Sequence, residues 1–335
     1  MRNWRNPVKI CCSAMAVLLL GLAAGAQTCL DANDMDVPTR SALETTAKRY
    51  FELAAHGDAA TLKQNSIASL AATFSGVETA VKDNQENLSG GQPTVRSPYL
   101  LKVEGSAPLE RAEFLCGVFG KSGQTSGSAE FVIPNLPQGT YGEVTLDVAG
   151  AKGSYMVSFV LQQQGADWKM GGFYVKAAQI NGHDAAWFAE KARAFHAKGQ
   201  NRNAWFYFLQ ARELAVPVPF MYTQLTDKLY DESQSVKSAD LPGDGSTIDL
   251  LADGKTYKLT TLFPMGVGSD LDLIVKYQAA DISNTAKIFQ DNTAVIKGLL
   301  TKFPEFRDAF DGVVARAVEP SGRDYGTLLP MKEIK

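Results

Sequence analysis

The most constraining feature of this chain is a change in the spacing of its apolar residues. From Ser41 to Asn84 they recur every three or four positions, which predicts two helices separated at Gly57-Asp58. From Tyr99 to Val175 apolar and polar residues alternate, which is typical of strands with one buried face. We expect strands at 99–103, 112–119, 130–133, 141–148, 154–162 and 168–175. Helices followed by strands indicate an α+β fold, in which an antiparallel sheet packs on N-terminal helices.

The same region carries three local cues to a known superfamily. They are Tyr50-Phe51 on the first helix, Gly57-Asp58 after it, and the segment Trp168-Lys169-Met170-Gly171-Gly172-Phe173-Tyr174 on the last strand. With this order of elements, residues 41–178 resemble the nuclear-transport-factor-two-like (cystatin-like) cone. The resemblance implies a cone-like α+β domain at 41–180, after an extended lead-in at 27–40. Members of that superfamily act as enzymes, binding domains and assembly modules, so the resemblance implies no single function.

A helical segment is expected at 183–235. Its residues resemble one tetratricopeptide repeat, with Gly199 at the turn and Pro217 after the second helix. The quoted pattern is Trp187-Phe188, Ala192, Phe195, Ala204, Phe208, Ala211 and Leu214. Stable arrays need about three repeats, and we find one, so we expect a connecting hairpin that leans on a neighbouring domain. The alternative is a peptide-binding solenoid, for which Trp205 and Tyr207 would be exposed partner anchors.

The remaining residues predict a linker and a second small domain. Residues 236–246 are polar and contain Pro242-Gly243, which indicates a linker. Residues 247–335 indicate a small α+β domain of no family that we recognise. Its elements are expected as strands at 247–251, 256–262, 271–277 and 313–318, a helix at 284–300 and a short turn or helix at 304–310.

The first 26 residues have the order of a secretory signal peptide. A basic start at Arg2, Arg5 and Lys9 precedes an apolar run from Ile10 to Ala24, and Ala24-Gly25-Ala26 offers a cleavage site. The apolar run is shorter than the roughly 20 residues of a membrane span. Cleavage would change the formal net charge from −3 to −6. We therefore expect an exported protein, periplasmic or extracellular, with no transmembrane helix in the mature chain and no nucleic-acid partner.

Two cysteines remain after cleavage, Cys29 and Cys116. An even pair in an oxidising compartment predicts a disulfide. The alternative is a buried free thiol at Cys116 and an unpaired Cys29 on a loose tail.

The sequence contains no complete catalytic, metal-binding or cofactor-binding motif. Gly117 to Ser122 resembles a phosphate loop, but Leu115 occupies the position that requires the first glycine. His56, His183 and His196 are not spaced as metal ligands, so neither a metal nor a cofactor is expected. Asp270 and Asp272 could share a proton or hold a cation, although solvation at the start of a strand is the favoured interpretation.

A ligand pocket is considered only inside the cone. Its candidate lining is aromatic: Tyr50, Tyr155, Phe159, Trp168 and Tyr174. The same residues would serve equally well as core packing. The ionisable residues expected nearby are Glu52, His56 and Asp147.

Export without a catalytic motif predicts a non-catalytic binding or assembly protein of the cell envelope. Its partner would be another envelope protein or a second copy of the chain. The alternative is a small-molecule-binding protein or enzyme that uses the cone. That alternative requires an enclosed pocket with at least one ionisable group of perturbed pKa.

Overall fold

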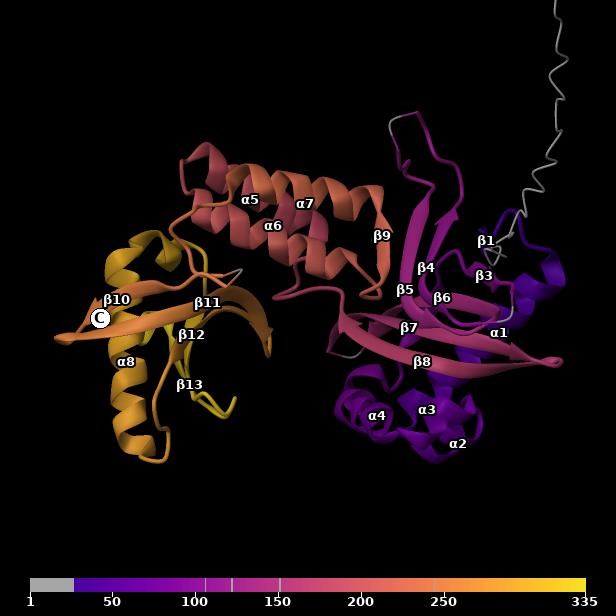
Figure 1. Ribbon diagram of the computed structural model, residues 1–335, viewed down its shortest axis with the longest axis horizontal. Coiled ribbons are helices and arrows are strands. Elements are labelled where there is room, and N and C mark those ends of the chain that lie inside the picture. Colours follow the sequence, from indigo (N-terminus) through magenta and orange to yellow (C-terminus); the bar gives the residue numbers. More distant parts are fainter. Residues whose placement is uncertain (1–26, 106, 122, 151, 244) are drawn as a thin grey trace, which may run out of the picture.

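The computed structural model describes residues 27–335 except 106, 122, 151 and 244, and the predicted signal peptide lies outside these residues. The described part is an α+β fold with eight α-helices and three mostly antiparallel sheets (Figure 1). No helix in this part is long and apolar enough to cross a membrane.

The first sheet contains four of the six strands that the alternation predicted, those expected at 99–103, 141–148, 154–162 and 168–175. Its order is β1-β3-β6-β7-β8, β2 also pairs with β6, and every pairing is antiparallel. The strands are β1 (Gln27–Leu30), β2 (Gln92–Val95), β3 (Tyr99–Val103), β6 (Gly139–Gly150), β7 (Gly153–Gln164) and β8 (Asp167–Ala177). Residues 27–30 were expected in a lead-in, but they form the edge strand β1 and pair with β3.

Four helices cover one face of this sheet: α1 (Val37–Ala55), α2 (Ala59–Gln64), α3 (Ala68–Ala72) and α4 (Ser75–Leu88). The second predicted helix is therefore wrong as a single element, because it is divided into three. The break between α2 and α3 follows from backbone hydrogen bonds to β8, since Ile67 N–H donates to Met170 O and Met170 N–H donates to Asn65 O, both at 2.9 Å. Those residues cannot also continue a helix.

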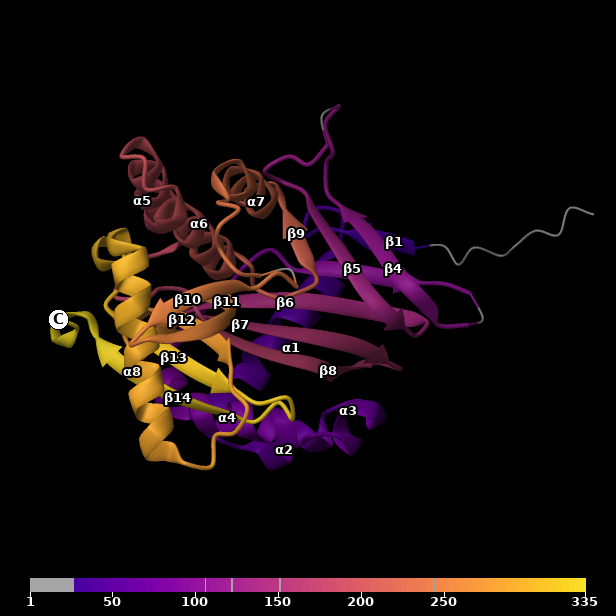
Figure 2. The same cartoon turned by 60° about the vertical axis from the view of Figure 1, so that its left-hand side comes forward.

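A second, three-stranded sheet lies over the opposite face. It consists of β4 (Leu109–Cys116), β5 (Ala129–Leu136) and β9 (Met221–Thr223), in that order. Figures 1 and 2 show α2–α4 on one side of β6–β8 and β4, β5 and β9 on the other. Cys116 at the end of β4 forms a disulfide with Cys29 on β1, with Cα atoms 5.1 Å apart. Both faces of β6 and β7 are thus covered.

The C-terminal half has its own core. Helices α5 (Ala185–Ala197), α6 (Asn201–Ala215) and α7 (Gln224–Val236) share one apolar cluster with the third sheet. That sheet has the order β10-β11-β12-β13-β14, and the pairing of β12 with β13 is parallel because α8 connects them. Its elements are β10 (Ile248–Ala252), β11 (Lys255–Val267), β12 (Asp270–Gln278), α8 (Thr285–Lys302), η1 (Pro304–Asp308), β13 (Gly312–Val318), β14 (Asp324–Pro330) and η2 (Met331–Glu333).

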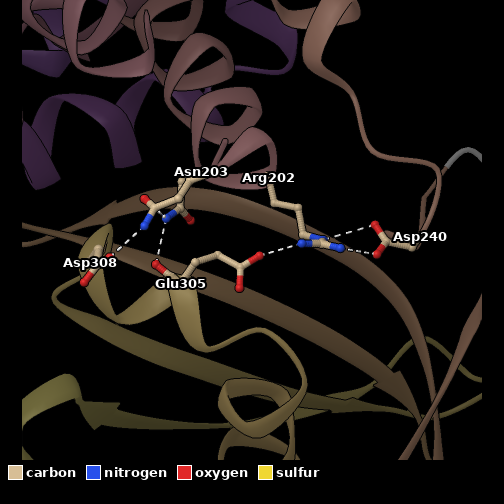
Figure 3. Close-up of polar contacts among 6 residues, drawn as sticks. Arg202, Asn203, Asp240, Glu305 and Asp308 are labelled. Atoms are coloured by element: carbon tan, nitrogen blue, oxygen red, sulfur yellow. Dashed lines mark hydrogen bonds and ion pairs between the residues drawn. The ribbon is translucent and has the colours of Figure 1, made fainter. Parts of the chain in front are cut away.

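Polar contacts join α6 to the C-terminal sheet domain (Figure 3). Arg202 at the start of α6 forms ion pairs with Asp240 and with Glu305. Beside it, the Asn203 side chain donates to the Glu305 carbonyl oxygen at 2.7 Å. One arginine therefore holds together the helix, the segment after α7 and η1.

Candidate functional site

The five aromatic residues predicted to line a pocket do not share one face of the first sheet. Tyr50 and Phe159 are fully buried, and Trp168 is 7% exposed, in the core beneath the helices. The Tyr50 hydroxyl donates to the Trp168 carbonyl oxygen at 2.8 Å. Tyr155 packs on the same core, whereas Tyr174 lies on the opposite face against Phe220. The predicted pocket is therefore mostly core packing, and Tyr174 alone belongs to the hollow described below.

The opposite face of the sheet contains a buried acid, Glu143. It lies in the middle of β6, with Tyr99 of β3 and Val160 of β7 as its cross-strand neighbours. Its side chain points away from the helices, because its neighbour Val144 belongs to the core beneath them. Glu143 is only 2% exposed.

A short chain of hydroxyl groups supports this carboxyl group. The Thr145 hydroxyl donates to Glu143 Oε1 at 2.6 Å, and Thr145 Oγ1 lies 2.7 Å from Ser158 Oγ. Since the single hydroxyl proton of Thr145 is used on Glu143, Ser158 donates to Thr145. No described residue donates to Glu143 Oε2 or forms an ion pair with it.

Burial raises the pKa of Glu143 to about 7, because the carboxylate loses its hydration. The Thr145 hydrogen bond and the charge of Arg96 oppose this rise only in part. Arg96 is itself committed elsewhere, since its Nε and Nη2 donate to Asp147 at 2.7 and 2.6 Å. The carboxyl group thus changes charge close to neutral pH.

Two cavities meet Glu143 from opposite directions along β6. The first, which we call the apolar hollow, has a volume of about 400 Å³. Its apolar lining comes mainly from Ile67, Leu101, Ile133, Leu136, Val160 and Phe220, with Tyr141 and Tyr174. The second, which we call the polar hollow, has a volume of about 820 Å³. Its polar lining comes from Arg96, Ser126, Ser128, Thr145, Thr223, Gln224 and Lys228.

This arrangement has two chemical capabilities. A carboxyl group with a pKa near 7 can hold or release a proton at neutral pH. Its ionised form can also pair with a cation, and the apolar hollow would bury the body of such a ligand. The sequence placed Glu143 on the wetter face of β6 and did not single it out. Thr145 and Asp147 lie on the same face of β6 by the same alternation. Glu143 is buried because the sheet of β4, β5 and β9 covers this face.

Trp205 and Tyr207, the residues expected to anchor a partner, differ from each other in exposure. Tyr207 is 6% exposed, and its hydroxyl donates to the Ala309 carbonyl oxygen at 2.6 Å. It is a core residue between α6 and the C-terminal sheet domain, so the expectation of an exposed anchor is wrong for Tyr207. Trp205 is half-buried and packs against the same core.

The other candidate groups do not form a second site. Asp272 is 3% exposed, which contradicts its expected solvation, and burial together with Asp270 and Asp311 raises its pKa to about 6. Across residues 27–335, apart from the four undescribed positions, no group of three or more histidine, cysteine, aspartate or glutamate side chains could hold a metal ion.

No protein-family model, curated protein or solved structure matches this chain.

Proposed function

We propose that this protein binds a small molecule, with the apolar part of the ligand in the apolar hollow and a polar group against Glu143. The observation that carries the proposal is a buried carboxyl group at the wall of a cavity, with no ion pair to any described residue. Burial of a carboxylate without an ion pair costs several kcal/mol of folding free energy. An apolar side chain at this position would pack without that cost. A pocket with an apolar wall and one convergent polar group is the usual form of a small-molecule site.

Binding, and not catalysis, is the function that these residues support best. Glu143, Thr145 and Ser158 form one hydrogen-bonded unit, and only Glu143 in this unit titrates near neutral pH. Of the ionisable residues expected to assist catalysis, Glu52 and His56 lie exposed on α1 and its end, while Asp147 is paired with Arg96. Orientation of a ligand requires nothing more than the Glu143 unit.

A fluorescent probe tests this proposal directly. N-phenyl-1-naphthylamine is uncharged, and its emission rises when it enters an apolar cavity. We expect enhanced emission with the wild-type protein and a loss of at least about tenfold in affinity with Val160→Phe, which fills the apolar hollow. Val118→Phe is the matched control, because Val118 is 74% exposed. No emission change with the wild-type protein, or equal affinity in Val160→Phe, would refute the proposal.

Two further proposals concern the export of the protein and the families that residues 41–180 and 183–235 resemble. We propose export, which the Cys29–Cys116 disulfide supports, since disulfides persist in oxidising compartments. We propose the nuclear-transport-factor-two-like likeness for residues 41–180, supported by helices on one face of an antiparallel sheet. The tetratricopeptide-like likeness for 183–235 is supported by two packed helices that turn at Gly199, where φ is +76°.

A further inference from the structure

The apolar hollow contains a single charge. Among the described residues that line it, Glu143 is the only one whose side chain is ionised in the neutral pH range. The rest of the wall is apolar or uncharged, and includes Leu101, Val160 and Phe220. A ligand in this hollow therefore meets one acidic group and no basic group.

Glu143 has capacity for one further interaction. Thr145 satisfies Oε1, and no described residue donates to Oε2. Arg96, whose charge lowers the pKa of Glu143, is itself held by Asp147 in a two-bond ion pair. No described residue forms an ion pair with Glu143, and the charge of Arg96 only partly offsets the effect of burial on its pKa.

We propose that the ligand is a protonated amine with an apolar body, and that its ammonium group pairs with Glu143 while the body fills the apolar hollow. This inference rests on the proposed function and names its ligand class. A carboxylate ligand would place a second negative charge beside Glu143, which opposes its binding. An alcohol of the same shape would add a hydrogen bond but no counter-charge.

The chemistry predicts how binding depends on pH. An ammonium group binds the ionised form of Glu143, whose pKa lies at about 7, so affinity rises as the pH increases from 5 to 8. The other titratable groups around Glu143 are Tyr99, Tyr141 and Tyr174, and burial raises the pKa of each above 10. The charged groups there are Arg96 and Lys228, which line the polar hollow.

Two probes of equal shape provide the test. 1-Naphthylmethylamine carries a positive charge from pH 5 to 8, and 1-naphthalenemethanol is neutral throughout. Calorimetric titration of the full mature chain at pH 8 should give an affinity for the amine at least about tenfold above that for the alcohol. Lowering the pH to 5 should reduce the affinity for the amine at least about tenfold and leave that for the alcohol unchanged. Glu143→Gln should remove both differences, and Glu78→Gln, on the exposed surface of α4, should preserve them.

The possible outcomes separate the two proposals. Equal affinities for amine and alcohol, or an affinity for the amine that does not depend on pH, overturn the amine assignment while binding itself stands. Failure of both probes to bind the wild-type protein overturns the proposed function as well. The wild-type measurements alone decide the amine assignment if Glu143→Gln does not fold.

Discussion

At the scale of single residues, the burial of Glu143 opposes stability. The ordinary pKa of a glutamate is 4.5, and burial raises that of Glu143 to about 7. Between these values the unfolded chain releases the proton and the folded chain keeps it, so stability falls as the pH rises through this window. Below pH 4.5 both states are protonated, and above pH 7 both are ionised. The total loss is on the order of 3 kcal/mol.

Glu143→Gln should remove this dependence on pH. We expect the unfolding free energy of the variant to approach that of the wild type near pH 4.5 and to exceed it near pH 8, because glutamine never ionises. Urea unfolding curves across this range measure the difference. Glu78→Gln should follow the wild type at every pH. A constant difference between Glu143→Gln and the wild type would contradict the buried-acid interpretation.

Thr145 provides a second test at the same scale. Thr145→Val keeps the shape but removes the only described hydrogen bond to Glu143. We expect a loss of about 1–3 kcal/mol at pH 8, where the carboxylate is charged, and a smaller loss at acid pH. Thr145→Ser keeps the hydroxyl group and should retain most of the stability. Equal losses in the serine and valine variants would show that packing, and not the hydrogen bond, is what matters.

At the scale of elements, the junction between α6 and the C-terminal sheet domain combines apolar packing with one branched ion pair. Phe206 of α6 contacts Phe306 and Phe310, with ring centroids 5.8 Å apart in both pairs. Arg202 bridges Asp240 and Glu305 at the edge of this cluster (Figure 3). These contacts make α5–α7 part of the C-terminal core.

Arg202→Ala tests the branched pair. The Glu305 side chain is 18% exposed and the Asp240 side chain is 49% exposed, so removal of the cation leaves one partly buried carboxylate without its ion pair. We expect a loss of about 1–2 kcal/mol in unfolding free energy by denaturant titration. Lys152→Ala is the control, since its pair with Glu86 lies at the surface and should contribute less to stability than the Arg202 pairs. Equal effects of the two substitutions would refute a special role for Arg202.

At the scale of the whole molecule, the Cys29–Cys116 disulfide joins the first sheet to the sheet that covers Glu143. The two cysteines are 87 positions apart, so the bond closes most of the N-terminal half into one loop. Because β4 belongs to the sheet that covers Glu143, the bond also limits how far that sheet can move from β1.

Replacement of both cysteines by serine should lower the unfolding free energy by about 2–5 kcal/mol, since the unfolded chain gains conformational freedom. Thermal unfolding, followed by circular dichroism, measures the change. The wild-type protein treated with a reducing agent should show the same shift, and the double variant should show none on reduction. A double variant as stable as the oxidised wild type would contradict this expectation.

Local patterns predicted most elements of this protein. The strands near 99–103, 141–148 and 154–162 agree with β3, β6 and β7, because side chains alternate along any strand with one buried face. The helix expected from Asn284 is α8, which Asn284 caps by accepting from the Lys287 backbone N–H at 3.0 Å. The strands β1, β2, β9 and β14 were not predicted. β1, β2 and β9 are only three or four residues long, and β2 contains Pro93, so the patterns of these three strands are weak.

The candidate site depends on contacts between distant segments. Alternation correctly placed Glu143 and Val144 on opposite faces of β6, but it indicated that the Glu143 face was wetter. That face is covered by β4, β5 and β9. Met221 of β9 pairs with Phe131 of β5, which lies 90 positions earlier in the chain. The sequence pattern of β6 carries no information about this cover, because alternation reports only which side chains share a face. Burial of Glu143, the two hollows beside it and the rise of its pKa therefore follow from the packing of segments that the chain brings together only when it folds.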